Sequence, residues 1–451
     1  MKEKELLVIG SGPGGYSTAL SAARLGASVA VVEKGGWGGT CTHRGCIPTK
    51  ALLAASGRYD GLRNLRRMGI GAAGGTFDFP SIRKHMEQMV RVSALGARKS
   101  LEEAGVELVE GEARLKSPVE VDIERAGGER ETAKARRIVI AWGSRSALPP
   151  GWRLSERVVT SSGFLAGKEL PEKALVVGAG AIGLEFATFL AELGKDVSVV
   201  ELMDQVLPGE DRDAAETLAG ELGKKGIRFF TSTRIDVPET ASGAIRLRGE
   251  SPAGAVDLEG DLVLVATGRR PNLRAEELDA LSIRYDGRGV AVGGNFETSV
   301  PGIHAVGDVT GGLLLAHRAM AQGKSLAAGI FGSQPVDYRE ENVPAVVYTH
   351  PGFGRVGLTE GEARRRGLAV DVRKAGFGGN LAARTELAGI GFVKALFHED
   401  RLLGAAVVGP SAGELTGALV LPVAAGMKRR ELQACVLPHP SLIEILGDLF
   451  S

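Results

Sequence analysis

Cysteine is scarce in this 451-residue sequence, which contains three of them. Three cysteines are too few for the disulfide framework of a secreted protein, so we expect a reducing, cytoplasmic location. Charge of one sign is lacking as well: 55 Lys and Arg residues against 54 Asp and Glu residues leave a formal net charge of +1. This balance gives no electrostatic reason to expect nucleic acid or an anionic membrane as a partner.

Long apolar runs and metal-binding motifs are also missing. The apolar stretch GALVLPVAAGM at 417–427 is too short to span a membrane and is interpreted as a buried helix. Because the sequence has no CxxC pair, no HExxH motif and no acidic calcium loop, we expect no bound metal. Aromatic residues make up only 5%, whereas glycine is abundant at 65 residues. Tight turns and close approach of the backbone to ligands explain such glycine usage.

The abundant glycine is organised into two matching motifs. Each motif follows an apolar strand, opens an Ala- and Leu-rich helix and is followed by a second strand that ends in glutamate. In each, 23 positions separate the first glycine from the glutamate. The two sets are Gly10, Gly12, Gly15 and Glu33, and Gly178, Gly180, Gly183 and Glu201.

These glycines and acids have distinct physical roles. The first glycine makes the tight turn, the second lets the backbone approach a pyrophosphate, and the third lets the helix pack closely on the strand. The helix N-terminus attracts the phosphates, and the acidic residue accepts a hydrogen bond from a ribose hydroxyl. One such motif is weak evidence, but two complete units in the same register predict two dinucleotide-binding domains.

The later sequence indicates a discontinuous first domain and a separate C-terminal domain. The stretches 138–144, 262–272 and 300–310 are predicted to be buried strands that end in turns, with Asp308 at a strand end, where α/β folds bind ligands. From about residue 337 the pattern changes to strand-length apolar segments followed by helices. The predicted fold class is therefore α/β, with two Rossmann-like dinucleotide-binding domains and a C-terminal α+β domain.

Six further motifs occur in the order seen in one known family. They are GGTCTHRGCIPTK, GAGAIGLEFA, ATGRRPN, AVGDVTGGLLLAHRAMAQG, VVYTHPGFGRVGLTE and LPHPSLIE. Through them nearly the whole chain resembles the pyridine nucleotide–disulfide oxidoreductases. Within that family it is most similar to the dihydrolipoamide dehydrogenases, through GCIPTK, GLEFA and VVGPSAGEL.

The resemblance assigns a cofactor or a role to each domain. It implies FAD in the first dinucleotide unit, NAD in the second, and dimerisation through the C-terminal domain. Prolines and a glycine cluster at 147–152, where the first boundary is expected. The expected domains are an FAD-binding domain at 1–146, an NAD-binding domain at 147–268, a central domain at 269–336 that completes the FAD site, and a dimerisation domain at 337–451.

Cys41 and Cys46 lie five positions apart in the first of these motifs. By themselves two such cysteines could be small buried hydrophobic residues, but Gly45 relaxes the turn between them and Pro48 constrains its exit. The resemblance implies that the pair forms a redox-active disulfide against the flavin. Cys41 is then expected to exchange with the substrate, and Cys46 to face the isoalloxazine.

The resemblance also implies an ion pair beside the flavin. Lysines are usually surface charges, but Lys50 is here expected next to the flavin and paired with Glu185 of GLEFA. A positive charge at that place stabilises an anionic reduced flavin.

His439 is the candidate base. It lies between two prolines, and Glu444 follows five positions later, where a carboxylate can orient the imidazole and fix its tautomer. A thiol substrate needs a base because the thiolate is the nucleophile. The resemblance implies that this histidine reaches the active site of the opposite subunit, so a homodimer is expected.

The resemblance further implies the cofactor contacts. Asp308 is expected at the ribityl chain of FAD, Glu33 at its adenosine ribose and Glu201 at the NAD ribose. Glu201 repels a 2′-phosphate, and the following LMDQVLPGED supplies no early arginine, so NAD is preferred over NADP. The other expected cofactor-binding residues are Gly10, Gly12, Gly15, Gly39, Thr40, Lys50, Gly143, Gly307, Ala316, His317, Gly178, Gly180, Gly183 and Gly268. For His317 a purely structural role fits equally well.

The implied activity is oxidation of dihydrolipoyl groups with NAD as the acceptor. The expected partners are lipoyl-bearing proteins of 2-oxoacid dehydrogenase or glycine-cleavage systems. The alternatives are a glutathione-type or mercuric reductase, a diaphorase-type flavoprotein, and a flavoprotein scaffold of a multienzyme complex. The tail ILGDLFS lacks the cysteine pair of mercuric reductases, and glutathione-type enzymes usually use NADP, which Glu201 disfavours.

Four residues depart from the family pattern. Trp142, Gln322, Gly352 and Leu437 stand where a threonine, two glutamates and a histidine are usual. None removes the sulfur, the flavin or the base machinery, and Trp142 is expected beside the flavin. The third cysteine, Cys435, has no nearby partner in the sequence and is expected in the core.

Overall fold

A computed structural model describes residues 2–71, 75–125, 127–241, 244–334 and 336–451. The chain divides into two compact units, each made of three chain segments. Unit 1 consists of Met1–Pro48, Lys84–Ala147 and Arg269–Glu340, and unit 2 consists of Thr49–Arg83, Leu148–Gly268 and Glu341–Ser451. None of the helices in the described ranges combines the length and the apolarity needed to cross a membrane.

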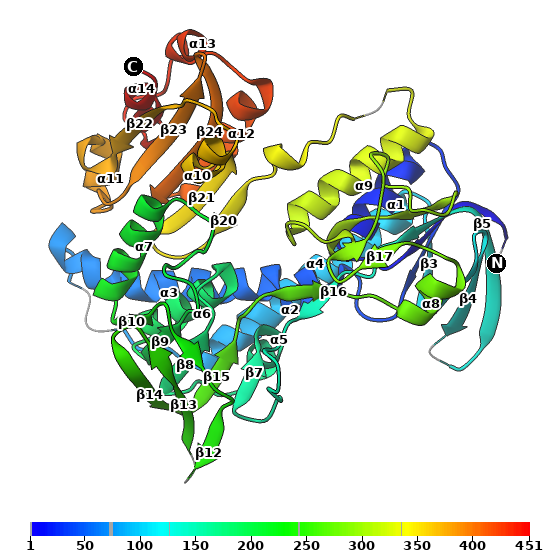
Figure 1. Ribbon diagram of the computed structural model, residues 1–451, viewed down its shortest axis with the longest axis horizontal. Helices are drawn as coiled ribbons and strands as arrows, with labels where there is room; N and C mark the ends of the chain where they lie inside the picture. The colour runs from blue at the N-terminus through cyan, green and yellow to red at the C-terminus, as the bar shows by residue number, and fades with distance from the viewer. Residues whose placement is uncertain (1, 72–74, 126, 242–243, 335) are drawn as a thin grey trace. The chain divides into compact units, whose positions relative to one another are not determined.

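A parallel sheet forms the centre of unit 1 (Figure 1). Strand β1 (Lys4–Ile9) lies between β2 (Val29–Glu33) and β5 (Arg130–Ile140). β2 pairs with β3 (Glu107–Ser117), and β5 pairs with β19 (Ile303–Ala305). Because β19 comes from the last segment of the unit and completes the sheet of the first, the first domain is discontinuous, as the sequence predicts.

Both faces of this sheet are covered. On one face α1 (Pro13–Arg24) and α9 (Ala316–Phe331) pack side by side (Figure 1). On the other face lie β4 (Glu120–Arg125), which pairs antiparallel with the outer parts of β3 and β5, and α8 (Ala275–Ala280). Parallel strands covered on both faces are apolar throughout, and Leu6–Val8 of β1 are fully buried accordingly.

Shorter elements complete unit 1. Residues 262–272, predicted to be one buried strand, are two strands in different units. β15 (Leu262–Val265) belongs to unit 2, and β16 (Arg269–Pro271) pairs with β6 (Ser144–Ser146) in unit 1. The break falls at Gly268, whose φ of 109° lies outside the range of a strand residue. Further elements are β17 (Tyr285–Asp286), β18 (Gly289–Val290), the 3₁₀ turn Gly307–Thr310 and α2 (Gly39–Arg44). Helix α3 (Cys46–Leu65) begins in unit 1 and continues into unit 2, whereas α4 (Phe79–Glu103) begins in unit 2 and continues into unit 1.

Unit 2 contains a second parallel sheet. Its order is β10 (Ile227–Phe230), β9 (Asp196–Val200), β8 (Lys173–Val177), β15 and β7 (Val158–Thr160), and all pairs are parallel. The helices that accompany it are α5 (Ser161–Ala166), α6 (Ala181–Glu192) and α7 (Arg212–Lys224). An antiparallel extension follows, formed by β11 (Arg234–Ile235), β12 (Glu239–Ala241), β13 (Ala244–Ser251) and β14 (Gly254–Gly260).

The C-terminal part of unit 2 is an antiparallel sheet. Its order is β20 (Ala345–Val347), β21 (Gly352–Gly357), β24 (Arg401–Gly409), β23 (Phe392–His398) and β22 (Asp371–Gly376). Its helices are α10 (Glu360–Arg365), α11 (Leu381–Thr385), α12 (Ala412–Ala425), α13 (Arg429–Gln433) and α14 (Ile445–Phe450). Its core joins α12 and α14 to β22, β23 and β24.

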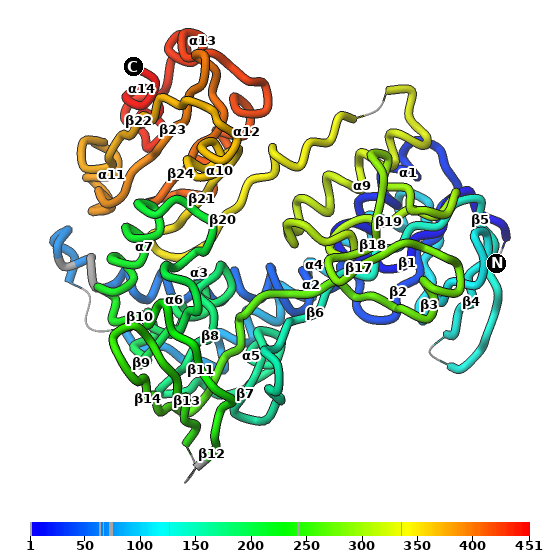
Figure 2. The backbone as a smooth tube through the Cα atoms, in the orientation of Figure 1, coloured from blue at the N-terminus to red at the C-terminus, as the bar shows by residue number. Residues whose placement is uncertain are grey.

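Helix α12 contains most of the apolar stretch predicted to be a buried helix. Leu419 is fully buried, but Leu421 is 74% exposed. The helix prediction is therefore right, whereas burial applies to one face only. Helix α7 lies beside this C-terminal sheet and contacts β21 and β24 (Figures 1 and 2).

Candidate active site

The first glycine motif forms a tight turn between β1 and α1. Gly10 has a φ of 107°, and a Cβ at this residue would lie 2.5 Å from the carbonyl oxygen of Ala141. A Cβ on Gly15 would lie 1.9 Å from the carbonyl oxygen of Gly10, so only glycine permits this contact between helix and turn. In contrast, no atom lies within 4 Å of a Cβ placed on Gly12, and no side chain caps the helix there. The helix N–H groups are thus open to an anion, which fits the pyrophosphate of a dinucleotide.

Glu33 holds this turn together. Its Oε2 accepts hydrogen bonds from the backbone N–H of Ser11 (2.7 Å) and from the Ser11 hydroxyl (2.8 Å), and its Oε1 accepts one from the N–H of Gly35 (2.7 Å). A carboxylate offers about four acceptor positions, so one remains for a ribose hydroxyl. The Ser11 hydroxyl also accepts from the N–H of Gly38 (3.1 Å). Glu33 therefore links the glycine turn to the start of the cysteine segment.

The two cysteines follow directly from that contact. Gly39 begins α2 with a φ of 61°, and a Cβ there would lie 2.7 Å from the Cα of Gly12. Cys41 lies on α2, and Cys46 is the first residue of α3. A Cβ on Gly45 would lie 3.5 Å from the Cα of Cys41, so the connecting turn folds back on the first cysteine. The chain thus places the cysteine segment against the first dinucleotide turn.

Asp308 belongs to a partly buried polar group in the same unit. Its Oδ2 accepts a short hydrogen bond from the Ser144 hydroxyl. Arg269 donates from Nε to the Ser144 hydroxyl and from Nη2 to the Ser144 carbonyl, both at 2.8 Å. Burial lowers the pKa of Arg269, although the negative charges of Asp308 and Cys46 act to raise it. Arg269 lies in the ATGRRPN motif but was not among the predicted site residues.

The departures from the family pattern have local explanations. The Oε1 of Gln322 accepts from the N–H of Gly307 (2.7 Å). The glutamine amide therefore provides the same acceptor oxygen as the usual glutamate, without its negative charge. A Cβ on Gly352 would already lie 3.1 Å from the Cβ of Ala412. Trp142 packs against the core on the face of the sheet opposite α1, with the Arg274 guanidinium 4.9 Å from its ring centroid. Its expected position beside the flavin stays a prediction.

The remaining predicted residues of unit 1 lie at turns and helix starts. Gly143 has a φ of 69° and directly precedes β6. Ala316 is the first residue of α9, and His317 is exposed. Thr40 is the second residue of α2 and is also exposed.

The second glycine motif repeats the first in detail. Gly178 has a φ of 104°, and a Cβ on Gly183 would lie 1.9 Å from the carbonyl oxygen of Gly178. No atom lies within 4 Å of a Cβ placed on Gly180. Glu201 Oε2 accepts from the N–H of Ala179 (2.7 Å), and its Oε1 accepts from the N–H of Met203 (2.8 Å). These bonds correspond position by position to those of Glu33. The geometry fits a second dinucleotide.

Lys50 and Glu185 form the expected ion pair within unit 2. The Lys50 ammonium lies 2.8 Å from both oxygens of Glu185, which is 5% exposed. The N–H of Tyr348 donates to Glu185 Oε1 (3.1 Å), and the Lys50 ammonium lies 4.6 Å from the centre of the Tyr348 ring. Tyr348 is a contact that the sequence analysis missed, although it lies in the VVYTHP motif.

A second acid on α6, Glu192, was missed as well. Its Oε2 accepts from the Ser56 hydroxyl (2.6 Å), and its Oε1 lies 2.8 Å from His350 Nδ1 and 3.1 Å from the Lys225 ammonium. Burial by itself raises the pKa of Glu192, but the hydrogen bonds and charges of these neighbours outweigh it and lower the pKa below its usual range. The sequence did contain a signal for Glu192: it lies seven residues after Glu185, a spacing that places both side chains on the same face of a helix.

His439 and Glu444 lie together near the C-terminus. His439 Nδ1 is 2.7 Å from Glu444 Oε1, and Glu444 Oε2 accepts from the N–H of Ser441 (2.8 Å). The backbone bond of Ser441 and then the bond to His439 lower the pKa of Glu444. With Nδ1 donating to a carboxylate, a neutral His439 presents its lone pair at Nε2. The side chain is 66% exposed, which leaves Nε2 accessible.

The pair borders an open hollow of about 350 Å³. Leu437 and Cys435 also line this hollow. Cys435 is exposed and donates weakly to the Glu431 carbonyl (3.6 Å), so its expected place in the core is wrong. It lies after the short helix α13, next to Val436, which is 96% exposed.

The predicted site residues thus fall into two groups. Unit 1 holds the first glycine turn, both cysteines, Asp308 and the residues around them. Unit 2 holds the second glycine turn, the Lys50–Glu185 pair and the His439–Glu444 pair.

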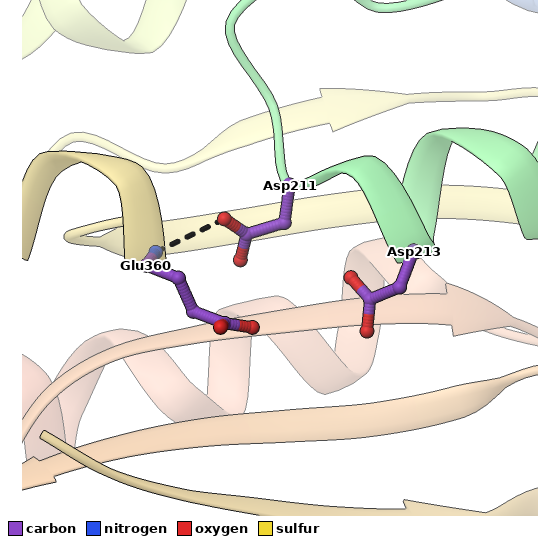
Figure 3. A group of neighbouring side chains, drawn as sticks. All are labelled: Asp211, Asp213 and Glu360. Atoms are coloured by element: carbon purple, nitrogen blue, oxygen red, sulfur yellow. Dashed lines mark hydrogen bonds between the residues drawn. The ribbon is translucent and has the colours of Figure 1, made fainter. Parts of the chain in front are cut away.

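Three carboxylates in unit 2 are close enough together to suggest a cation site. Figure 3 shows Asp211, Asp213 and Glu360, whose oxygens lie within 4.8 Å of one another. The Lys394 ammonium, however, lies 2.7 Å from an oxygen of each. The lysine therefore already occupies the position that a cation would need.

Comparison with known families and proteins gives consistent matches. Residues 4–323 match the family described as pyridine nucleotide-disulphide oxidoreductase, and residues 343–449 match its dimerisation domain. A dihydrolipoyl dehydrogenase from Geobacillus stearothermophilus is 35% identical over 447 residues, covering 98% of this chain and 94% of that protein. One from Trypanosoma brucei brucei is 37% identical over 456 residues, with 98% and 95% covered.

Solved structures agree with these matches. LpdA from Mycobacterium tuberculosis superposes with a TM-score of 0.92 at 27% identity, covering 99% of this chain and 98% of that one. The HOCl-induced flavoprotein disulfide reductase RclA from Escherichia coli, in a Cu(II) complex, gives 0.88 at 27% identity, with 100% and 99% covered.

Proposed function

Because the chain belongs to the pyridine nucleotide-disulphide oxidoreductase family, we propose that it is a dihydrolipoyl dehydrogenase. It oxidises protein-bound dihydrolipoyl groups and reduces NAD, and its cofactors are the FAD and NAD of its family. The observation that carries the proposal is the packing of Gly39 on Gly12. Through it the segment with Cys41 and Cys46 begins on the first dinucleotide turn, so a thiol pair and a dinucleotide site share one structural element.

The sulfur chemistry proceeds by thiol–disulfide exchange. A dihydrolipoyl thiolate attacks Cys41 Sγ of a Cys41–Cys46 disulfide, which forms a mixed disulfide and releases the Cys46 thiolate. The second lipoyl thiolate then attacks the lipoyl sulfur of that mixed disulfide. This step closes the oxidised lipoyl ring and releases the Cys41 thiolate. Two electrons have passed from the substrate to the cysteine pair, and the helix N-terminus at Cys46 favours its negative charge.

His439 takes the proton in this scheme. Its Nε2 accepts the proton of the attacking thiol, while the Nδ1–Glu444 bond holds the ring and stabilises the resulting imidazolium. FAD, when bound, would supply the two-electron acceptor between the cysteine pair and NAD. The Lys50 ammonium supplies a fixed positive charge for that site, and Glu185 and the Tyr348 ring determine where this charge lies.

Glu201 supports NAD as the acceptor. Both of its oxygens are fixed by backbone N–H groups, so the carboxylate stays where a 2′-phosphate would have to lie. The first arginine after it, Arg212, pairs with Asp204 and Glu216. This arrangement disfavours the glutathione-type alternative, which usually uses NADP.

The assembly proposed here is a homodimer in which His439 serves the cysteines of the other subunit. The match to a dimerisation domain over residues 343–449 supports a dimer. The proposed partners are lipoyl-bearing proteins of 2-oxoacid dehydrogenase or glycine-cleavage systems, in the cytoplasm. The proposed domains remain 1–146, 147–268, 269–336 and 337–451. The pairing of β19 with β5 supports the view that the third of these completes the first.

Turnover with defined substrates tests this function. The purified holoenzyme is assayed with dihydrolipoamide, glutathione disulfide and Hg(II), each with both nicotinamides. We expect fast turnover only for dihydrolipoamide with NAD. The Cys46→Ser variant should lose this activity and keep its FAD, because it removes one sulfur of the exchanging pair. A variant that still oxidises dihydrolipoamide would exclude the sulfur mechanism and favour a diaphorase.

A scaffold role without catalysis predicts the opposite pattern. In that case the wild-type protein would co-purify with an acyltransferase core but would not oxidise dihydrolipoamide.

A further inference from the structure

The residues between Glu201 and helix α7 form one loop, at 202–211, which we call the nucleotide loop. Figure 2 traces it between β9 and α7. Its first half lies against the second glycine turn: Met203 donates its N–H to Glu201, and Leu207 donates its N–H to the carbonyl oxygen of Ala179 (2.9 Å). The loop thus contacts both the proposed ribose acid and Ala179, whose N–H also donates to that acid.

The loop has an unfavourable backbone conformation at its centre. Leu207 has a φ of 47°, in the left-handed region, which costs a non-glycine residue about 1 kcal/mol or more. The Leu207 side chain is nevertheless buried. Contacts elsewhere must therefore hold the loop in this conformation.

One such contact comes from the C-terminal sheet. Arg355, on β21, donates from Nε to Glu210 Oε2 (2.6 Å) and from Nη1 to the Gly357 carbonyl (2.7 Å). Both side chains of the Arg355–Glu210 pair are only 15% exposed. Gln205 donates to the backbone carbonyl of Glu210 (2.9 Å), so this end of the loop is also bonded to its middle. Burial raises the pKa of Glu210, and the Arg355 charge opposes that rise.

The second contact is the carboxylate cluster of Figure 3. Asp211, the last residue of the loop, lies 2.7 Å from the Lys394 ammonium of β23 and accepts from the N–H of Glu360 (3.0 Å). Asp213 and Glu360 take the other two ammonium protons at 2.7 Å. Lys394 is 1% exposed, and its three donors are all satisfied.

We propose that Arg355 and Lys394 are positioning residues for the pyridine nucleotide. Through Glu210 and Asp211 they hold the nucleotide loop, and with it Glu201, in the conformation that binds NAD. The affinity for the nucleotide therefore depends on two cations of the C-terminal sheet. This inference rests on the proposed role of Glu201.

The test separates positioning from stability. Arg355→Met leaves Glu210 buried without its partner, whereas Arg355→Met/Glu210→Gln removes both charges and with them that penalty. The affinities for NAD and for ADP-ribose are measured by titration calorimetry on the FAD-loaded holoenzyme, together with the KM values for NAD and dihydrolipoamide. Arg228→Met is the control, because it breaks an exposed ion pair with Asp196 in the same unit, away from the loop.

We expect both Arg355 variants to bind NAD and ADP-ribose about five- to tenfold more weakly, with the KM for dihydrolipoamide and the FAD content unchanged. The single variant should also lose thermal stability, and the double variant should regain it. Wild-type affinity in the double variant would overturn the positioning role of Arg355, because the Arg355–Glu210 ion pair would then contribute only to stability.

Asp211 and Asp213 provide a matched pair for Lys394. Each gives the ammonium one carboxylate, but only Asp211 belongs to the nucleotide loop. Asp211→Asn should weaken nucleotide binding about two- to threefold, and Asp213→Asn should leave it unchanged. Equal losses in the two variants would show that the cluster does not act through the loop.

These outcomes are distinct from a failure of the proposed function. If the wild-type protein binds ADP-ribose but does not oxidise dihydrolipoamide, the substrate assignment is wrong and the positioning inference stands. If dihydrolipoamide is oxidised while every variant binds the nucleotide like the wild type, only the positioning inference is wrong.

Discussion

At the scale of single residues, the acids of the site are fixed by backbone N–H groups before any ligand arrives. Glu33, Glu201 and Glu444 each accept at least one such bond. Glu185 accepts one from Tyr348 as well as two from Lys50. Such preorganisation matters because a charge that is already oriented needs no reorganisation during the reaction.

The Lys50–Glu185 pair gives a first prediction. Lys50→Met leaves the buried Glu185 carboxylate with only the N–H of Tyr348, so the variant should lose about 1–2 kcal/mol of stability. Because Lys50 supplies the proposed charge beside the flavin, turnover should fall about 100-fold or more. Calorimetry and the rate of dihydrolipoamide oxidation measure the two effects.

A double variant separates these two roles of the pair. Lys50→Met/Glu185→Gln removes the unpaired charge and should recover most of the stability but none of the activity. Recovery of turnover in the double variant would mean that the Lys50 charge has no part in the reaction.

The His439–Glu444 pair gives a second prediction. His439→Gln should lower turnover about 10²- to 10⁴-fold, the usual contribution of a general base. Glu444→Gln should have a smaller effect, because an amide oxygen still accepts from Nδ1 but stabilises the imidazolium less. The KM for NAD should not change in either variant. Glu444 also forms a capping box with Ser441 at the start of the turn Leu442–Glu444. An equal loss in both variants would therefore indicate that Glu444 mainly stabilises the local fold around His439.

At the scale of secondary-structure elements, helix α6 organises unit 2. Glu185 and Glu192 lie two turns apart on one face, and each bonds both to α3 and to the segment 348–350. The glycine turn at its N-terminus fixes where the helix starts, and therefore where both acids lie. Glu192 thus supports the position of the Lys50–Glu185 pair without belonging to it.

The Glu192 cluster predicts a pH-dependent contribution to stability. The pKa of Glu192 in the folded chain lies below its ordinary value of 4.5. Its charged form therefore favours folding, and this contribution is complete above the ordinary value and is lost as the pH falls through the lower folded value. Glu192→Gln should cost about 2 kcal/mol near neutral pH. The difference in Tm between the wild type and the variant should narrow at acidic pH, below about 4.5.

Glu172→Gln is the control for this pH series. Glu172 pairs with Lys195 but is 78% exposed, so its contribution should be small at every pH. If the Tm difference of Glu192→Gln stayed constant down to acidic pH, the Glu192 charge would not contribute to stability.

The sequence predicts the local parts of the site better than the distant ones. In each glycine turn the bond to the acid spans 22 positions, and the repeat of the two motifs in register made both visible. The Lys50–Glu185 pair was accessible only through the resemblance, because 135 positions separate the two residues. Glu192–His350 and Glu210–Arg355 span 158 and 145 positions, and no motif spacing reports such contacts. Cys435 was misplaced because burial depends on the surrounding fold.

At the scale of the whole molecule, the proposed role of His439 depends on a second subunit. Its side chain is 66% exposed and borders an open hollow, and residues 343–449 match a dimerisation domain. In a C2 dimer the same surface is used twice, so a base donated by each subunit to the other gives two equivalent sites. A monomer would then be inactive even with every catalytic residue present.

Hybrid dimers test this arrangement. Cys46→Ser and His439→Gln subunits are each inactive as homodimers, and they are co-expressed with different tags so that the hybrid can be purified. If His439 serves the other subunit, the hybrid contains one site with both intact cysteines and an intact histidine, and it should regain about half of the wild-type turnover per dimer. If His439 serves its own subunit, each site lacks one component, and the hybrid should be as inactive as its parents. A hybrid of wild-type and His439→Gln subunits, expected at half activity in either case, calibrates the measurement.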